Sequence, residues 1–408
     1  MQQKYDVIIV GAGPAGIICA YLLNNKGLRI AIIEKASFPK DKTCGDALSL
    51  DVLNQLKIIN PILAQEFELI TEKIPSYGIK IVSPAGHVIE MPIYSDDNQK
   101  KCGYVCKRIV FDQFLYEQLK NNSEVDFYFD TTVEDVNCTF KSATVQTSKG
   151  TFDAQIVIGA DGAHSIVKKK MIDKTIEKNH YSAGLRQYFK NVAHFNSENF
   201  IELYFFKEIL PGYLWVFPLP NNEANVGIGI LSSTISKKHL NLKKIFQQLI
   251  NEHPLLKDRF KDAIPMENIK GYGLPLGSKK NKISGNRFLL LGDAASLIDP
   301  FSGEGIGNAI RSGRIAADVI ISAFSKNNFS ASFLHAYDKE IYRKMWPEFF
   351  ISRKMQKLSC YARAFDFIGR KVEKSNYLKT FMQDTLTNVH KKKILIGPKF
   401  LFHLFLKK

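Results

Sequence analysis

The residues with the clearest chemistry lie within the first 34 positions. Apolar residues 7–10 lead into Gly11-Ala12-Gly13-Pro14-Ala15-Gly16, and a helical stretch and a second apolar run follow before Glu34. The first glycine permits a tight turn, the second lets backbone approach a pyrophosphate, and the third lets the helix pack closely on the strand. The helix N-terminus offers unpaired N–H groups to phosphates, and an acid at a strand end accepts from ribose hydroxyls. This order predicts an adenine dinucleotide site.

Two more glycine–acid segments follow apolar runs much later in the chain. They are Gly159-Ala160-Asp161-Gly162 and Gly292-Asp293, and the second continues into a glycine-rich loop at 299–307. An acid beside glycine can approach a cofactor without a side-chain clash, although each segment also suits a simple turn or a helix cap. Gly303 and Gly305 precede a predicted helix whose N-terminus can face a polarised ring edge.

The elements that must position these residues alternate between two kinds of structure. Apolar runs before each glycine segment predict parallel strands, whereas residues 78–105 and 181–232 have strand patterns with many aromatics. Helices are predicted from residue 46 to about 74, over 107–120, 238–250 and 304–324, and through the remainder. We therefore predict an α/β fold: a Rossmann-type nucleotide domain (1–75, 105–180, 271–330) interleaved with a β-sheet substrate domain (76–104, 181–270), plus a helical C-terminal region (331–408).

Composition narrows the class of protein. The 408 residues are 45% hydrophobic and 24% charged, which is ordinary for a globular chain. The six cysteines form no CxxC pair, so we expect reduced thiols, no metal site and a cytoplasmic location. The net charge is +16, and residues 339–408 contain 17 Lys or Arg against five Asp or Glu. Together with several phenylalanines, this basic end favours contact with the inner face of an anionic membrane or, equally, a solvated helix surface, and no nucleic-acid motif accompanies it.

The three glycine segments, in this order, resemble the FAD-dependent oxidoreductases of the p-hydroxybenzoate hydroxylase fold. In that family the first motif holds the FAD pyrophosphate, the acid like Glu34 holds the adenosine ribose, and the loop like 303–307 lies along the isoalloxazine. The arginine of an R-x-x-F-D motif, present here from Arg108, also contacts FAD. The resemblance implies these cofactor-binding residues: Gly11, Gly13, Pro14, Ala15, Gly16, Glu34, Lys35, Lys42, Cys44, Gly45, Arg108, Val133, Asp161, Gly162, Gly292, Asp293, Pro300, Gly303, Gly305 and Ile306.

Two further segments resemble the geranylgeranyl reductase family. The first is Phe38-Pro39-Lys40-Asp41-Lys42-Thr43-Cys44-Gly45-Asp46, similar to a P-x-x-K-x-C-G segment; the second runs from Tyr213 through Trp215 to Gly229 and is similar to a Y-x-W…G-x-G segment. In that family the tyrosine and tryptophan line an isoprenoid cavity and the cysteine loop borders the flavin. Asp46 stands where a second glycine is frequent, and the gap from Trp215 to Gly227 is longer than usual.

The expected function is reduction of C=C bonds in an isoprenoid or similar lipophilic substrate, by hydride transfer from flavin N5. Cys44 is the candidate proton donor, and Tyr213, Trp215 and Phe217 are the candidate substrate-binding residues. Phe205 and Phe206 are adjacent in an extended stretch and must face opposite sides, so at most one lines the pocket.

The fold alone leaves other chemistries open. One alternative is an NAD(P)H-dependent flavin monooxygenase acting on an aromatic or polyketide-like molecule; another is an electron-transfer flavoprotein with a membrane partner. A halogenase is disfavoured because the chain contains no W-x-W-x-I-P segment. No second G-x-G-x-x-G marks a separate nicotinamide domain, so the electron donor is NAD(P)H or a ferredoxin-like protein.

Overall fold

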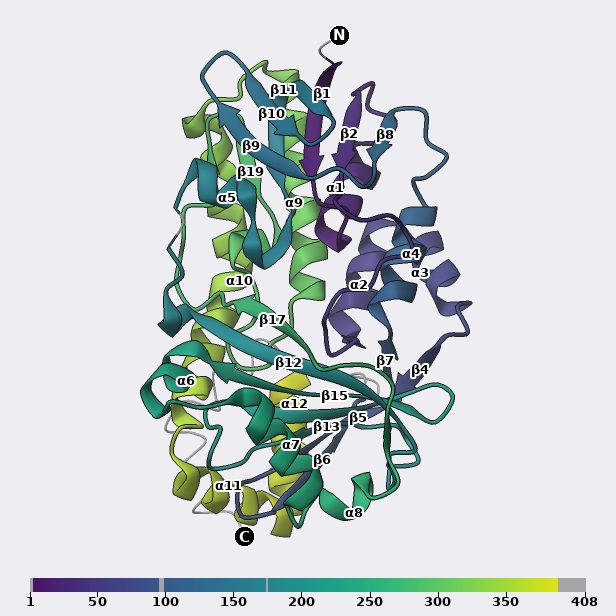
Figure 1. Cartoon of the computed structure of the whole chain (residues 1–408), viewed down its shortest axis with the longest axis vertical. Coiled ribbons are helices and arrows are strands. Elements are labelled where there is room, and N and C mark those ends of the chain that lie inside the picture. Colours follow the sequence, from purple (N-terminus) through teal and green to yellow (C-terminus); the bar gives the residue numbers. More distant parts are fainter. Residues whose placement is uncertain (1–2, 95–98, 174, 388–408) are drawn as a thin grey trace.

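The computed structural model describes residues 3–94, 99–173 and 175–387. Within these ranges, two large sheets lie one above the other in Figure 1, and long helices from the C-terminal part of the chain run beside both. The upper sheet in this view contains the N-terminal strand, and the lower sheet contains the aromatic-rich strands. The mixed α/β class predicted from the sequence is therefore confirmed.

The first sheet draws its strands from distant parts of the chain. They are β1 (Gln3–Val10), β2 (Ile30–Ile33), β8 (Val125–Tyr128), β9 (Val133–Cys138), β10 (Ala143–Thr147), β11 (Gly150–Gly159), β18 (Ser284–Gly285) and β19 (Phe288–Leu290). The order is β18-β19-β11-β1-β2-β8, and the β19–β11, β11–β1, β1–β2 and β2–β8 pairs are parallel. The carboxyl ends of these parallel strands meet at one edge, where ligands bind in open α/β sheets.

The second sheet carries the aromatic strands. Its order is β16-β12-β15-β14-β13-β5-β6, with β17 also paired to β12. The bounds are β5 (Gly78–Val82), β6 (Val88–Pro92), β12 (Tyr181–Lys190), β13 (Ile201–Tyr204), β14 (Tyr213–Leu219), β15 (Glu223–Leu231), β16 (Ile264–Pro265) and β17 (Lys270–Pro275). The domain boundary predicted at residue 271 is wrong by a few residues, because it cuts β17, whose backbone pairs with β12 over six positions.

A small sheet of β3 (Ala47–Leu48), β4 (Lys73–Ser76) and β7 (Gly103–Cys106) joins the two halves. The helical stretch predicted before residue 74 is in fact two helices, α2 (Leu50–Ile59) and α3 (Pro61–Glu68). Proline cannot continue a helix, and Asn60 caps the second one by accepting from Ile62 N at 2.9 Å. The remaining helices are α1 (Pro14–Leu23), α4 (Arg108–Glu117), α5 (Ile166–Met171), α6 (Ser232–Lys238), α7 (Leu242–Glu252), α8 (Lys257–Phe260), α9 (Ile306–Ser325), α10 (Ala331–Leu358), α11 (Ala362–Lys374) and α12 (Asn376–Thr387).

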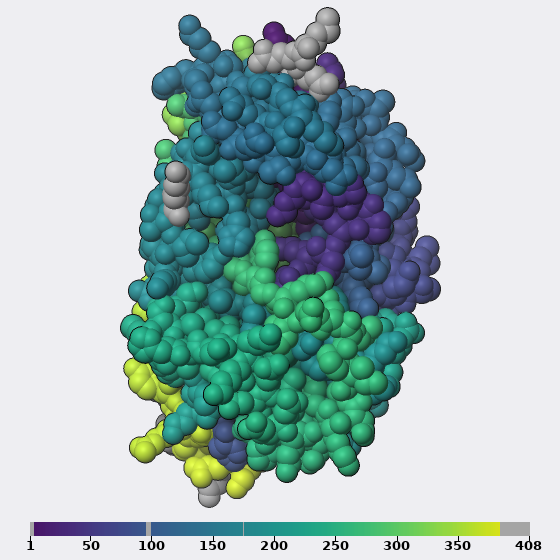
Figure 2. Space-filling model, in the orientation of Figure 1, coloured from purple at the N-terminus to yellow at the C-terminus, as the bar shows by residue number. Residues whose placement is uncertain are grey.

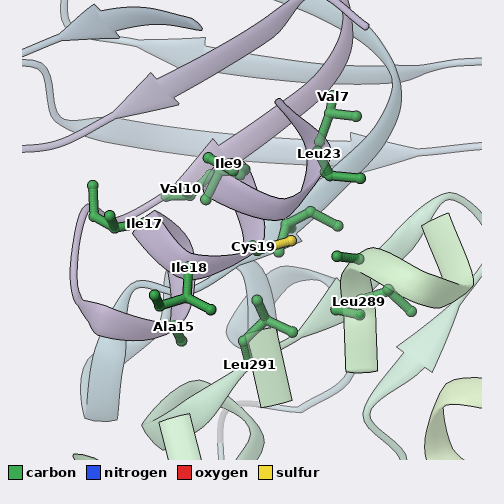
Figure 3. Packing of buried hydrophobic residues seen from close by; sticks show 14 of the residues in the cluster. Val7, Ile9, Val10, Ala15, Ile17, Ile18, Cys19, Leu23, Leu289 and Leu291 are labelled. Atoms are coloured by element: carbon green, nitrogen blue, oxygen red, sulfur yellow. The ribbon is translucent and has the colours of Figure 1, made fainter. Parts of the chain in front are cut away.

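The main core lies between the first sheet and its helices. Figure 3 shows Val7 of β1 next to Leu23 of α1 and Ile9 of β1 near Cys19 of α1, with Leu289 and Leu291 lower in the view. Strand β1 is buried on both faces because helices or strands cover each side, which explains its continuous apolar run. Helix α9 approaches α1 closely, since a Cβ on Gly313 would lie only 2.5 Å from the Ala15 carbonyl oxygen. This packing holds the glycine loop at the end of β1.

The C-terminal helices cover the second sheet. Figure 1 shows α11 below the strands of this sheet and α12 partly behind them, and in Figure 2 yellow C-terminal residues lie at the lower surface of the molecule. Helix α11 is anchored by Asp366, which accepts from Ser83 Oγ at 2.8 Å. Residues 388–408, which hold six of the 17 Lys or Arg of the basic end predicted to meet a membrane, lie outside the described part. None of the helices within the described ranges is both long and apolar enough to span a bilayer.

Candidate active site

The loop between β1 and α1 is closed by protein at two glycines and open at the third. Gly11 has a φ of +101°, and a Cβ there would lie 2.5 Å from the Ala160 carbonyl oxygen. A Cβ on Gly16 would lie 2.2 Å from the Gly11 carbonyl oxygen. A Cβ on Gly13 would meet no atom of the described residues within 4 Å. The open side therefore faces the N-terminus of α1, next to Pro14, where a pyrophosphate fits.

Glu34 lies at the end of β2 and faces this loop. Its buried carboxylate accepts from Ala12 N at 2.9 Å and from Lys40 Nζ at 2.5 Å. Lys35, which the resemblance placed at the cofactor, is exposed, and Val133 is the first residue of β9. The fold thus brings Lys40 to Glu34, a contact that the sequence analysis missed because it depends on how the loop after β2 returns.

Asp293 and Lys42 meet at the junction of the two sheets. Lys42 Nζ lies 2.7 Å from Asp293 Oδ2 and 5.0 Å from the centre of the Tyr272 ring. Burial acts to lower the pKa of the Lys42 ammonium, but the Asp293 carboxylate outweighs this effect and holds the pKa above its usual value. Gly292 just before Asp293 has a φ of +53°, which favours glycine. Both predicted residues therefore lie together at the edge where the strands end.

Asp161 has a structural partner in the next helix. Its Oδ2 accepts from Ile166 N at 2.7 Å and from Val167 N at 3.3 Å, so it caps the start of α5. Its Oδ1 is buried and finds no hydrogen-bond partner in the part of the chain that the structure describes, and burial raises the pKa of this carboxyl. Gly162 next to it has a φ of +77°. The unpartnered oxygen is compatible with a polar ligand group, and the role of Asp161 at the cofactor stays a prediction.

Arg108 is held by the acid of its own motif. Its guanidinium donates to both carboxylate oxygens of Asp112, at 2.7 and 2.6 Å, and both side chains are buried. Burial acts to lower the pKa of the Arg108 guanidinium, but the Asp112 carboxylate has the larger opposite effect. The pKa is therefore above its usual value, and the arginine stays charged. Its backbone N–H donates to Asp46 Oδ1 at 3.2 Å. The R-x-x-F-D spacing therefore builds an i,i+4 pair on α4 beside the cysteine loop.

The loop at 299–307 is shaped by its own acid. Asp299 Oδ1 accepts from Phe301 N at 2.9 Å and from Ser302 N at 2.8 Å. Gly303 has a φ of +71°, and α9 begins at Ile306. Gly305 therefore stands directly before the helix N-terminus, as the sequence predicts.

Side chains from two other elements hold this loop in place. The Tyr213 hydroxyl of β14 donates to the Ser302 carbonyl oxygen, and Gln356 of α10 donates through Nε2 to the Pro300 carbonyl oxygen at 2.6 Å. Burial raises the pKa of the Tyr213 hydroxyl, so it remains a donor. Tyr213, predicted as a substrate residue, thus contacts the loop that would lie along the flavin ring.

Cys44 lies in a loop that packs on the aromatic face of β14. A Cβ on Gly45 would lie 3.0 Å from a ring carbon of Phe217 and 3.6 Å from Trp215 Nε1. Burial raises the pKa of the Cys44 thiol, and the nearby Asp46 carboxylate raises it too, so the thiol holds its proton at neutral pH. The structure therefore brings the loop of Cys44 and Gly45 to Trp215 and Phe217, although these residues are far apart in sequence. The partly buried Cys44 side chain packs against the main core.

Asn225 and Asp46 connect the Cys44 loop to Trp215 by hydrogen bonds. Asn225 Oδ1 accepts from Trp215 Nε1 at 2.8 Å, and its Nδ2 donates to the Cys44 carbonyl oxygen at 2.8 Å and to Asp46 Oδ2 at 2.7 Å. The Tyr188 hydroxyl also donates to Asp46 Oδ2, at 2.6 Å. Asn225 and Asp46 are both fully buried. One side chain therefore sets the position of both the tryptophan and the cysteine loop.

The charge of Asp46 is costly at this site. Burial raises the pKa of its carboxyl to about 6, although hydrogen bonds from Tyr188 and Asn225 act to lower it. Its φ is +66°, a region that favours glycine, which explains why glycine is frequent at this position in the family it resembles. Sequence reasoning missed Tyr188 and Asn225; the only available signal was a polar side chain within an otherwise apolar strand.

The adjacent phenylalanines separate as predicted. Phe205 belongs to the apolar cluster that contains Tyr213 and Phe301, whereas Phe206 belongs to the cluster on the other face of the second sheet, with Phe246. Only Phe205 therefore approaches the loop at 299–307.

Three features of the site fit FAD: the open glycine loop, the acid at the end of β2 and the helix that begins at Ile306. Comparison with known proteins supports the same cofactor. Residues 4–346 match the family described as an FAD binding domain. The chain is therefore an FAD-dependent oxidoreductase.

Proteins of similar sequence identify the family of oxidoreductases to which the chain belongs. The digeranylgeranylglycerophospholipid reductase of Methanosarcina mazei is 33% identical over 355 residues, which cover 85% of this chain and 82% of that protein. The enzyme of the same name from Methanococcus vannielii is 31% identical over 353 residues, with coverages of 83% and 82%. The chain belongs to the geranylgeranyl reductase family.

Solved structures share the fold. A geranylgeranyl bacteriochlorophyll reductase-like protein from Thermoplasma acidophilum superposes with a TM-score of 0.80 at 24% identity, and the match covers 99% of both chains. A flavin-dependent brominase superposes with a TM-score of 0.75 at 18% identity over 96% of this chain and 94% of that chain. Reductases and halogenases thus share one architecture, so the fold does not choose the reaction.

Proposed function

We propose that this chain saturates carbon–carbon double bonds of a prenyl chain carried by a lipid. One observation supports this most: the loop of the half-buried Cys44 packs through Gly45 on Trp215 and Phe217, and Tyr213 of the same strand holds the loop at 299–307. An apolar, water-excluding wall therefore stands beside a thiol that keeps its proton. The names of the two archaeal relatives, which act on a digeranylgeranylglycerophospholipid, agree with this substrate class.

The reaction divides between cofactor and protein. Reduced FAD, when bound, supplies a hydride to one alkene carbon. The protein must then deliver a proton to the other carbon, exclude water and hold the chain in line. Cys44 is the proposed proton donor, because its raised pKa keeps the thiol protonated, and the Asn225 contact to its carbonyl oxygen fixes the loop. The electron donor in this proposal is NAD(P)H or a ferredoxin-like protein.

An anaerobic assay tests the proposal. The FAD-loaded enzyme is reduced with dithionite and mixed with a panel of geranylgeranyl lipids and prenylquinones, and products are identified by mass spectrometry. We expect products heavier by about 2 Da per reduced double bond, with matching reoxidation of the flavin. Absence of such products across the panel, together with substrate-stimulated NAD(P)H oxidation and incorporation of oxygen in air, would establish a monooxygenase instead.

A cysteine pair separates chemistry from folding. Cys44→Ala removes the proposed donor, whereas Cys102→Ala alters a half-buried cysteine just before β7. We expect Cys44→Ala to keep FAD and lower the rate of product formation about 100-fold, the usual range for loss of a general acid. Equal rates for the two variants would show that Cys44 is not the proton donor. The product assay alone would then decide whether the protein is a reductase.

Peripheral contact with the inner face of a membrane forms part of the same proposal. Its support is the basic composition of residues 339–408. Co-sedimentation with vesicles containing anionic phospholipid should fall as salt rises, and deletion of residues 391–408 should weaken it. Unchanged binding after the deletion would exclude that segment as the anchor.

A further inference from the structure

A cavity of about 560 Å³ opens on the lower part of the molecule, away from the glycine loop. It lies between residues 207–211, α6 and the turn from α10 into α11, on the side where Figure 1 shows α6 and α11. Its base includes Leu210 and Pro211, and Tyr361 stands at its edge with 67% of its surface exposed. The cavity is therefore apolar inside and open to solvent.

The charges around this cavity have one sign. Its lining includes Lys207, Lys237, Lys238 and Arg363 and contains neither Asp nor Glu. Across the described ranges, these four side chains take part in none of the ion pairs; Lys238 Nζ donates only to the Glu208 carbonyl oxygen, at 3.3 Å.

Some other charges on α10 and α11 do have ion-pair partners. Glu340 of α10 contacts both Arg343 and Lys344, and Glu373 of α11 contacts His87. Four uncompensated cations around one hollow produce a positive potential that attracts a multiply charged anion, and phosphate accepts several charge-assisted hydrogen bonds. The cavity therefore has the charge and the donors for a phosphate group.

An apolar cluster connects the base of this cavity to the loop at 299–307. Leu210 lies in the cluster with Phe205 and Phe365. The Phe205 ring lies 4.8 Å from Phe365, 5.6 Å from Tyr213 and 6.1 Å from Phe301 between ring centres. Phe301 belongs to the loop that would face the flavin. Cations at one end and aromatic rings leading to the reaction centre match an amphiphile with an anionic head.

We propose that this cavity binds the phosphate-bearing head of the lipid substrate while the prenyl chain follows the apolar cluster toward the flavin. The inference rests on the proposed function and deepens it, because it identifies the cavity and the side chains that hold the head group of the substrate. A free phosphate ion presents the same chemistry, so the test must separate the two sources. Binding of a phosphate head with an attached apolar chain also explains why the four cations surround an opening with an apolar base.

Binding is measured by calorimetry with the full-length, FAD-loaded enzyme. The probes are a short-chain diacylglycerol phosphate, the same diacylglycerol without phosphate, and inorganic phosphate. The test variant is Lys237→Gln/Lys238→Gln/Arg363→Gln, and its matched control carries Lys26→Gln, Lys57→Gln and Lys141→Gln, three exposed lysines elsewhere.

We expect the phosphorylated lipid to bind more tightly than the other two probes, and the test variant to lose about tenfold in affinity for it while the control does not. Equal affinities in the test and control variants would overturn the site. Inorganic phosphate binding as tightly as the lipid would show a free-phosphate site and overturn the head-group assignment.

A second measurement separates this inference from the proposed function. Turnover is followed with a diether lipid bearing two geranylgeranyl chains and a glycerol phosphate, and with the same diether lacking phosphate. The test variant should raise KM for the phosphorylated lipid about tenfold and leave kcat and the neutral lipid unchanged. Reduction of both lipids with no change in KM would overturn the head-group site alone; reduction of neither would overturn the proposed function, and calorimetry would then decide the cavity by itself.

Discussion

The two ends of the active site are built in different ways. At the end of β1, the glycine loop presents backbone N–H groups, and its shape depends on the absence of side chains at Gly11 and Gly16. Around Cys44, the site is made of side chains from three separate segments joined by Asn225 and Asp46.

This difference has a physical consequence. A backbone-built site tolerates substitution poorly but depends on few residues, whereas a network of buried polar side chains depends on every member being satisfied. Substitutions in the glycine loop should therefore abolish FAD binding altogether. Substitutions around Cys44 should instead lower stability by amounts that differ from residue to residue.

The largest effect is expected from a glycine pair. Gly11→Ala places a methyl group 2.5 Å from the Ala160 carbonyl oxygen at a φ of +101°, so we expect it to lower the melting temperature and abolish FAD binding. Gly13→Ala meets no described protein atom, so the FAD-free chain should melt near the wild-type temperature while FAD affinity still falls. The ratio of flavin to protein absorbance and thermal melts report both. Equal melting temperatures in the two FAD-free variants would contradict this account of the loop.

The second largest effect is expected from Asn225, whose side chain hydrogen-bonds to Trp215, Cys44 and Asp46. Asn225→Leu leaves Trp215 Nε1 without its acceptor and removes a donor from the buried Asp46 carboxylate. The expected loss in free energy of unfolding is about 3 kcal/mol, since two buried polar groups lose partners. Urea denaturation measures it, with Asn54→Leu, at an exposed position of α2, as the control. A loss as small as that of the control would show that the hydrogen bonds are dispensable.

A pH series isolates Asp46. The folded chain holds this proton up to about pH 6, whereas an unfolded aspartate releases it near its usual value of 3.8. Between these pH values the native state binds more protons, so stability falls as pH rises, by up to about 3 kcal/mol. Asp46→Asn should lack this component, and the stability difference between variant and wild type should change between pH 4 and 6 and stay level above pH 7. Denaturation of the FAD-free chain across pH 4–8 checks this, and a constant difference would contradict it.

The smallest effect concerns the ion pair at the junction. Lys42→Gln removes the partner of Asp293, and we expect a loss of about 1 kcal/mol in the free energy of unfolding. Lys35→Gln is the matched control, because that side chain is exposed and should change stability by less than about 0.5 kcal/mol. If both variants behave alike, the ion pair between Lys42 and Asp293 does not stabilise the fold.

Much of the cofactor end could be predicted from sequence because its signals are local. Gly11, Gly16 and Glu34 lie within 34 residues and act through backbone turns and one strand end. The break before Pro61 was missed although its signal is local, and the boundary at 271 was wrong because strand pairing, not composition, assigns β17 to the second sheet.

The sequence by itself determined the kind of cofactor, since glycine spacing after an apolar strand dictates a backbone shape whatever surrounds it. Only the tertiary structure decided the partners: Asn225 reaches Asp46 across 179 positions and Lys42 reaches Asp293 across 251. The cationic cavity likewise combines residues near 207, 237 and 363. Such contacts depend on how sheets and helices pack, and packing is a property of the whole fold that no short segment encodes.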